Sequence, residues 1–169
     1  HPERAGRRLE RLNEVSGREL EAEAQALART WDDELAEELA AQPALFQTWA
    51  GFFPEHYKGY TTPQLAAIDI ACFARLDAGE SFVVSLHGLG EGRPTRIALY
   101  KRDDKIELSR AMPMLEDLGL RVMEEISTRL LVDDGIWVQE FRVLGPDEQP
   151  LDLDDVGDRV ADAIAAVYQ

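Results

Sequence analysis

The chain has 169 residues, of which 33 are acidic and 18 are basic, so its formal net charge is −15 at neutral pH. This length fits one domain of about 100–150 residues with an appendage, and 45% apolar residues can build a core without metal or disulfide support. The acidic balance argues against nucleic acid and anionic membranes as partners, because binding to both depends on clustered Lys and Arg.

The single cysteine, Cys72, has no partner for an internal disulfide. The sequence lacks the basic segment followed by an apolar segment that is typical of a secretion signal. It also contains no apolar run close to the roughly 20 residues of a membrane-spanning helix. We therefore expect a cytoplasmic protein with no membrane partner.

The first 60 residues are predicted to be helical after a flexible lead-in at residues 1–15. Ser16 and Glu19 have capping-box spacing, and apolar residues then recur every three or four positions up to Leu39. This pattern predicts a long amphipathic helix, which Pro43 interrupts. An aromatic-rich segment follows, so residues 16–60 are interpreted as a helical linker or packing segment.

The period of the apolar residues changes from about 3.6 to 2 within the next segment. Thr62 and Pro63 predict the start of a helix that ends near residues 77–79. Alternating residues at 81–87 and 96–101 then predict two strands joined as a hairpin. Ser109 is predicted to cap a short helix, with Pro113 in its first turn and Gly119 as its left-handed C-terminal residue.

A second hairpin and a last helix complete the pattern. Residues 122–132 and 136–144 alternate as strands, and Asp134 with Gly135 predicts a two-residue type I′ turn between them. Residues 151–169 are predicted to form a C-terminal helix with an apolar stripe, which leads to the remainder of a longer parent chain.

The resulting order from Thr62 is helix, strand, strand, helix, strand, strand, helix. A ferredoxin-like βαββαβ domain that is read cyclically from its first helix has this order. We therefore predict an α+β fold in which residues 61–150 form a four-stranded antiparallel sheet, circularly permuted, with helices on one face.

Four motifs resemble segments of one known family, in the order in which that family carries them. Their residues are Trp31-Asp32-Asp33-Glu34-Leu35; Phe53-Pro54-x-x-Tyr57 with Ala66 and Asp69-Ile70; Met112-Pro113-x-Leu115-Glu116-Asp117-Leu118-Gly119-Leu120-Arg121-Val122; and Trp137-Val138-Gln139-Glu140-Phe141. They resemble the large NAD-dependent glutamate dehydrogenases of bacteria. Met112, Asp117 and Glu140 stand where that family usually has Leu, Asn and Asp.

This resemblance implies that residues 61–150 are an ACT-like module ahead of a catalytic domain that the sequence lacks. The implied function is a non-catalytic regulatory or assembly module of an enzyme that converts L-glutamate, NAD and water to 2-oxoglutarate, ammonia and NADH. Its implied partners are neighbouring modules of the parent chain, other subunits of a homo-oligomer and, as an alternative function, an amino-acid effector. NAD would belong to the parent enzyme only.

We predict no catalytic, cofactor-binding or metal-binding residues. The glycines Gly88, Gly90 and Gly92 lie between two predicted strands, whereas a dinucleotide fingerprint lies between a strand and a helix. His56 and His87 lack neighbouring ligands at metal-binding spacing. A free-standing enzyme is therefore the least favoured hypothesis.

One loop is a candidate effector site. It lies between the last strand and the last helix, where effectors of amino-acid-binding ACT domains sit, and it comprises Gly145, Pro146, Asp147, Glu148 and Gln149. The acidic start of the next helix would repel an anionic ligand. A plain connector is therefore the favoured alternative.

A candidate interface with another module or subunit lies in the helical segment. Its apolar side chains exceed what one small sheet needs, and they are Leu27, Trp31, Leu35, Trp49, Phe52 and Phe53. The equally weighted alternative is that these residues pack within the chain.

Overall fold

A computed structural model describes residues 17–23, 30–133 and 135–168. Residues 17–23 and 30–38 are helical, in agreement with the predicted amphipathic helix. The predicted lead-in at residues 1–15, the capping residue Ser16 and the candidate interface residue Leu27 lie outside the described residues. Among the described residues, no helix combines the length and apolar character needed to cross a bilayer.

Three short helical elements and one long helix follow this first helical segment. They are α2 (Pro43–Trp49), the 3-10 helix η1 (Ala50–Phe52), α3 (Glu55–Tyr60) and α4 (Pro63–Asp77). Pro43 is the first residue of α2, where its missing N–H costs no helical hydrogen bond. Thr62 caps α4 as predicted, because its Oγ1 accepts a hydrogen bond from the backbone N–H of Leu65 at 3.2 Å.

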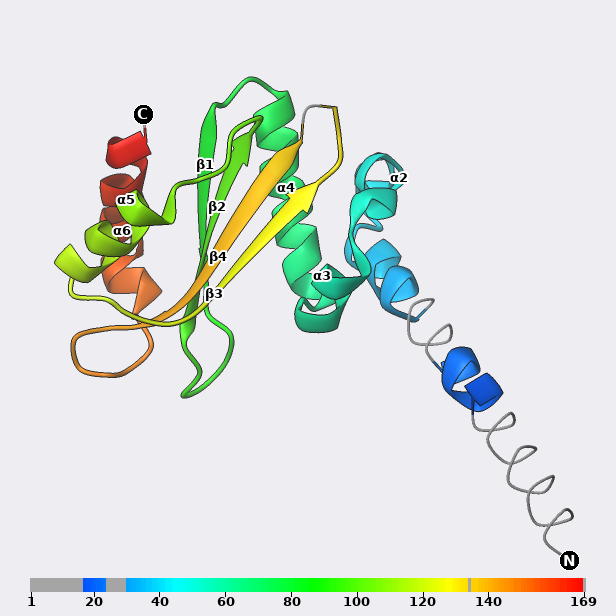
Figure 1. Ribbon diagram of the computed structural model, residues 1–169, viewed down its shortest axis with the longest axis horizontal. Helices are drawn as coiled ribbons and strands as arrows, with labels where there is room; N and C mark the ends of the chain where they lie inside the picture. The colour runs from blue at the N-terminus through cyan, green and yellow to red at the C-terminus, as the bar shows by residue number, and fades with distance from the viewer. Residues whose placement is uncertain (1–16, 24–29, 134, 169) are drawn as a thin grey trace, which may run out of the picture.

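The sheet has four antiparallel strands in the order β1-β2-β4-β3 (Figure 1). Its strands are β1 (Phe82–His87), β2 (Thr95–Arg102), β3 (Arg121–Leu130) and β4 (Ile136–Leu144). Helix α5 (Leu108–Asp117) connects β2 to β3, which run parallel with β4 between them, so this unit is a split βαβ.

Helix α6 (Leu153–Tyr168) follows β4 and packs on β1. Strands β4 and β1 are also parallel, with β2 between them. A link from the end of α6 to the start of β1 would complete a second split unit. The topology is therefore a circularly permuted ferredoxin-like fold that is opened before β1, with α5 and α6 as its two helices. The sequence prediction opened the fold before α4 instead, and thus counted α4 in place of α6.

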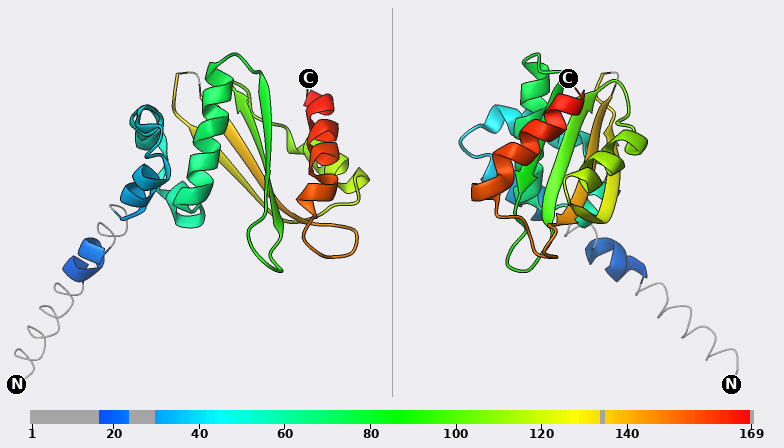
Figure 2. Two further views of the ribbon diagram at one scale, coloured as in Figure 1. Left: turned by 180° about the vertical axis from the view of Figure 1, so that it is seen from behind. Right: turned by 90° about the vertical axis from the view of Figure 1, so that its left-hand side faces the viewer.

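Helices cover both faces of the sheet, which corrects the prediction of helices on one face only. Helices α5 and α6 cover one face, and α4 with the preceding helices covers the other (Figures 1 and 2). In β2, Ile97 and Leu99 join the core under α5 and α6, while Ala98 and Tyr100 join the core under α4. Helix α4 therefore lies outside the permuted ferredoxin-like unit. Its apolar side packs on the sheet face that α5 and α6 leave uncovered.

Two local predictions were wrong in detail. Helix α5 begins at Leu108, so Ser109 lies inside it and Pro113 is its sixth residue, beyond the first turn. The helix starts earlier because Ile106, which is 1% exposed, is anchored in the core just before it. In the second hairpin Leu130 pairs with Ile136, so five residues connect the strands instead of a two-residue turn.

Candidate functional site

A network of charged side chains lies buried between α4 and the sheet. Arg96 of β2 donates hydrogen bonds to both carboxylate oxygens of Asp69 of α4, over 3.0 and 3.1 Å, and from Nε to Glu140 Oε1 of β4 over 2.7 Å. The exposed fractions of Asp69, Arg96 and Glu140 are 0%, 1% and 3%. Solvent therefore does not screen these ion pairs, and each charge depends on its partners for stabilisation.

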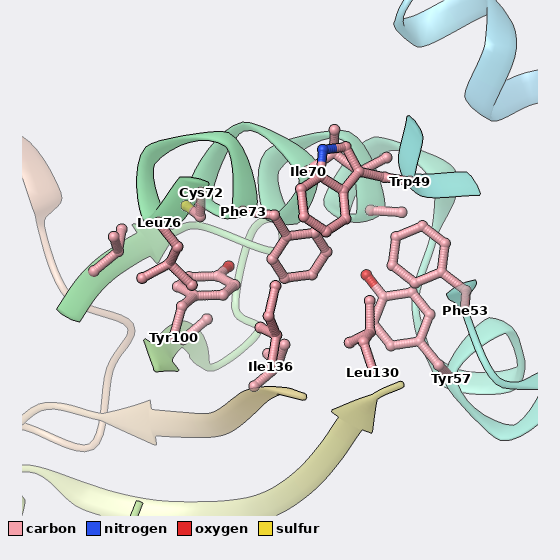
Figure 3. Packing of buried hydrophobic residues seen from close by; sticks show 14 of the residues in the cluster. Trp49, Phe53, Tyr57, Ile70, Cys72, Phe73, Leu76, Tyr100, Leu130 and Ile136 are labelled. Carbon is pink, nitrogen blue, oxygen red and sulfur yellow. The ribbon is translucent and has the colours of Figure 1, made fainter. Parts of the chain in front are cut away.

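Two tyrosine hydroxyls complete the hydrogen bonding of Asp69. Tyr57 of α3 and Tyr100 of β2 each donate to one of its carboxylate oxygens. Figure 3 shows the two rings on either side of Phe73, one from the helical segment and one from the sheet. Burial and then the charge of Asp69 raise the pKa of both tyrosines well above their usual value, so both remain hydrogen-bond donors at neutral pH.

Arg142 of β4 extends the network toward the surface. Its Nε lies 3.4 Å from Glu140 Oε1, and its Nη2 donates to the backbone carbonyl of Tyr60 over 3.3 Å. The Tyr60 hydroxyl in turn bonds to the Thr128 hydroxyl of β3. Arg142 Nη1 also lies 3.8 Å from the Glu124 carboxylate of β3, so the network connects α3 and α4 to three strands.

This ion-pair network was not predicted from the sequence, and its burial rules out contact with a substrate. The sequence analysis contains Asp69 and Glu140 only within family motifs, and Arg96 only as one residue of an alternating strand. The burial of Arg96 and Glu140 becomes visible only in the folded sheet, where Thr95 to Tyr100 and Val138 to Phe141 are all buried. The arrangement connects the helical segment to the sheet through buried hydrogen bonds.

An aromatic cluster surrounds the same junction and contains most of the candidate interface. Leu35, Trp49 and Phe53 are 0%, 2% and 6% exposed, so they pack within the chain, as the alternative interpretation stated. Trp31 is partly buried and donates from Nε1 to the carbonyl of Thr61 over 2.8 Å. Of the described candidates only Phe52, at 41% exposed, presents a large apolar surface to solvent.

The candidate effector loop closes on itself at the end of β4. The N–H of Gly145 donates to the carbonyl of Gln149 over 2.8 Å, and the N–H of Glu148 donates to the carbonyl of Gly145 over 2.9 Å. The Asp147 carboxylate accepts a hydrogen bond from the N–H of Gln149, and Glu148 forms an exposed ion pair with Arg121. The loop is therefore ordered by its own hydrogen bonds and presents two carboxylates to solvent.

An apolar cavity of about 290 Å³ adjoins this loop at Pro146. Its other walls come from the end of α5 and the first turns of α6, and Arg159 is the only charged residue that lines it. The complete lining is Leu118, Leu120, Pro146, Leu151, Val156, Arg159 and Val160. Such a cavity fits an apolar side chain with one anionic group better than it fits a polar ligand.

The glycines Gly88, Gly90 and Gly92 lie in the connection between antiparallel strands β1 and β2. They therefore do not form the strand-to-helix turn that binds a dinucleotide. Among residues 17–23, 30–133 and 135–168, no three His, Cys, Asp or Glu side chains are grouped for a metal ion. Cys72 of α4 is buried in the core as a free thiol.

Comparison with known proteins matches both halves of this arrangement to one family. Residues 84–156 match the ACT3 domain of glutamate dehydrogenase, and residues 26–76 match helical motif 2 of glutamate dehydrogenase. The chain belongs to the NAD-specific glutamate dehydrogenase family. The resemblance of the sequence motifs to this family is thereby confirmed.

Three relatives are NAD-specific glutamate dehydrogenases. The protein of Halomonas elongata is 31% identical over 133 residues, which is 73% of this chain. Those of Pseudomonas aeruginosa and Mycobacterium tuberculosis are 27% and 28% identical over 158 and 152 residues, or 88% and 83% of this chain. The matches cover 8%, 10% and 9% of the three relatives, so the chain spans about a tenth of their length.

The ion-pair network crosses the boundary between the two matched parts of the glutamate dehydrogenase family. Tyr57 and Asp69 lie within the match to helical motif 2, whereas Arg96, Tyr100 and Glu140 lie within the match to the ACT3 domain. The two parts are therefore joined by a buried electrostatic contact and a shared apolar core.

Proposed function

We propose that this chain is a non-catalytic regulatory and assembly module of a cytoplasmic NAD-dependent glutamate dehydrogenase. The proposed parent reaction converts L-glutamate, NAD and water to 2-oxoglutarate, ammonia and NADH, with NAD and the catalytic residues held by other parts of the parent chain. The proposed partners are neighbouring modules and other subunits of a homo-oligomer.

The buried junction between helical motif 2 and the ACT3 domain is the observation that carries this proposal. A module that transmits position between segments of a long chain must hold its own parts in one geometry, and the Asp69–Arg96–Glu140 contacts provide that. The exposed edge strand β3 and the exposed side chains of Phe52 and Met123 are available to a neighbouring module.

The assembly role is tested with the chain alone and with the rest of the parent enzyme produced separately. Sedimentation velocity is expected to show self-association, or a complex with the remaining part. The Phe52→Ser variant is expected to weaken that association while the chain stays folded. The assembly role would be contradicted if the chain remained a monomer both alone and in the presence of the rest of the parent enzyme.

The regulatory role has one alternative form, an effector-sensing ACT domain. The cavity beside the Gly145–Gln149 loop supports it, because Arg159 could hold the carboxylate of an apolar amino acid. Thermal unfolding with a panel of amino acids and 2-oxoglutarate tests this form. A ligand at 100 times its Kd adds about 2.7 kcal/mol, which raises the midpoint by several degrees.

The Arg159→Gln variant is the matched control, because it removes the only charge in the cavity wall. A selective shift that this variant abolishes would favour effector sensing. Equal shifts for both proteins, or none, would leave the assembly role as the proposed function.

Catalysis by the chain itself is tested by following NADH absorbance with 2-oxoglutarate and ammonium. We expect no turnover, because the glycine-rich connection between β1 and β2 is not a strand-to-helix turn that binds a dinucleotide. Measurable NADH oxidation would contradict a non-catalytic module.

A further inference from the structure

A cleft of about 600 Å³ lies between the end of β2, the start of α5 and the end of α6. It is separate from the candidate effector loop, because that loop precedes Leu153 whereas Tyr168, at the other end of α6, lines the cleft. The 16 residues of α6 span roughly 24 Å. We call this site the basic cleft.

The charge of the basic cleft is opposite to that of the chain. Lys101, Lys105 and Arg110 line it, against the carboxylates of Asp104 and Glu107. This leaves one net positive charge in a chain whose net charge is −15, and it uses two of the three lysines in the sequence.

The two lysines of the basic cleft are not neutralised by the described part of the chain. Neither Lys101 nor Lys105 forms an ion pair with a described residue, although Lys101 is partly buried. The Lys105 Nζ lies 5.7 Å from the centre of the Trp137 ring, and Trp137 is the partner of Lys101 across β2 and β4. A cation that faces a ring keeps hydrogen-bond donors for an anion.

The α6 side of the basic cleft adds further donors. Arg110 lies over the Tyr168 ring at 5.2 Å, and its Nη2 donates to the carbonyl of Val167 over 2.8 Å. The Tyr168 hydroxyl is buried and has no hydrogen-bond partner among the described residues. Burial raises its pKa, so it remains protonated and able to donate. A buried hydroxyl without a partner is unfavourable unless a ligand or water accepts its hydrogen bond.

The N-terminus of α5 contributes to the same wall. No side chain caps this helix, and Ser109 in its first turn also lines the cleft. Backbone N–H groups at the start of a helix favour a negative group, and here they add to the lysines.

We propose that the basic cleft binds a small ligand that carries a phosphate or carboxylate group. Lys101 and Lys105 would hold the oxyanion, and Tyr168 would donate a hydrogen bond to it. The volume of the cleft lies within the usual range for small-molecule sites. The strongly acidic remainder of the chain repels longer polyanions, so a nucleic acid would not fit.

Inorganic pyrophosphate and succinate are the probes, titrated at constant ionic strength and followed by NMR chemical shifts of the Trp137 indole. We expect saturable binding of at least one probe. Lys101→Met and Lys105→Met should each weaken it at least about tenfold, because each removes a charge-assisted hydrogen bond. Binding of pyrophosphate alone would indicate a phosphate ligand, and binding of succinate alone would indicate a carboxylate ligand.

Lys58→Met is the matched control, because Lys58 lies on α3 and pairs with Asp32 on the other side of the sheet. It should bind both probes as the unaltered chain does, and so should Arg159→Gln, which tests the separate effector cavity. Lys105 is exposed, so Lys105→Met gives an answer even if Lys101→Met fails to fold. The absence of saturable binding, or equal loss in Lys58→Met, would overturn the proposal.

Discussion

Arg96 of β2 binds both carboxylate oxygens of Asp69 of α4 in a paired geometry, although both side chains are excluded from solvent. The two residues are 27 positions apart in the chain and belong to different matched parts of the family. Burial opposes the charged form of Arg96, but the charge of Asp69 more than compensates and its pKa is raised. Arg96 therefore stays charged, and the contact depends on its geometry for stability.

Asp69→Asn should destabilise the chain strongly, because it leaves Arg96 with one buried carboxylate instead of two. Removal of one partner from a buried ion pair costs about 3–5 kcal/mol. Urea denaturation followed by circular dichroism measures the change in the free energy of unfolding. Arg75→Gln is the control, since Arg75 forms an exposed ion pair with Glu80 and its loss should hardly change stability.

An unchanged free energy of unfolding in Asp69→Asn would mean that the network does not hold α4 on the sheet. Tyr57→Phe tests the same junction with a smaller change, because it removes one donor to Asp69 and keeps the ring. We expect a loss of about 1–2 kcal/mol from the lost charge-assisted hydrogen bond.

The stability of the chain should fall at alkaline pH, and Cys72 should cause the first part of that fall. Burial and then the charge of Asp69 raise the pKa of Cys72 from 9.0 to about 11. Below pH 9 the thiol is neutral in both states, so its contribution is fully present. Between pH 9 and 11 the unfolded chain releases the proton first, which removes about 2–3 kcal/mol of stability.

Urea denaturation at pH 8, 9 and 10 measures this loss, with Cys72→Ala as the control. The variant should lose less stability over this interval, because the raised pKa of Tyr57 and Tyr100 affects stability only above about pH 10. Parallel curves for the two proteins would show that Cys72 does not titrate as its burial implies.

The positions of the strands and helices were largely predictable, because apolar period and end signals are local. Thr62, Pro63 and Gly119 mark element ends in the structure as they do in the sequence. The face of the sheet that each helix covers was not predictable. The apolar stripe of α4 shows that one side of this helix is buried, but it does not show which surface that side packs against. Strand β2 is buried on both faces, so its alternating pattern could not identify a single solvent side.

The ion-pair network lay beyond sequence reasoning for a related reason. Arg96 and Glu140 are 44 positions apart, and each looks like an ordinary outward residue when it is considered alone. Only the register between β2 and β4, with α4 on the same face, brings Arg96 into contact with both Glu140 and Asp69. The number of aromatic residues in the candidate interface does not reveal whether they pack within the chain or against another module.

Leu35→Ala and Phe52→Ala should lower the free energy of unfolding by different amounts, because the two candidate interface residues differ in burial. Leu35 is fully buried, so its truncation should lower the free energy of unfolding by about 2–5 kcal/mol. Phe52 is 41% exposed and contacts Trp49 edge-on at 6.5 Å, so its truncation should cost less than about 1 kcal/mol. Chemical denaturation measures both values, and similar losses would contradict this division.

Gly119 lies at the end of α5 and packs against Pro146 of the candidate effector loop. Substitution of Gly119 should therefore measure how strongly the end of α5 and this loop are coupled. Its φ of +81° is left-handed, and an added Cβ would lie 2.9 Å from Pro146 Cγ. Gly119→Ala should therefore cost about 1–3 kcal/mol, from the backbone strain and from displacement of Pro146. Gly88→Ala is the matched control, because an added Cβ there meets no atom within 4 Å.

The double variant Gly119→Ala with Pro146→Ala separates the two causes. Removal of the proline ring relieves the close contact but leaves the left-handed backbone, so part of the lost stability should return. The size of that recovery measures the coupling between the end of α5 and the loop. If Pro146→Ala restores nothing, backbone strain alone accounts for the effect, and α5 transmits no displacement to the loop through this contact.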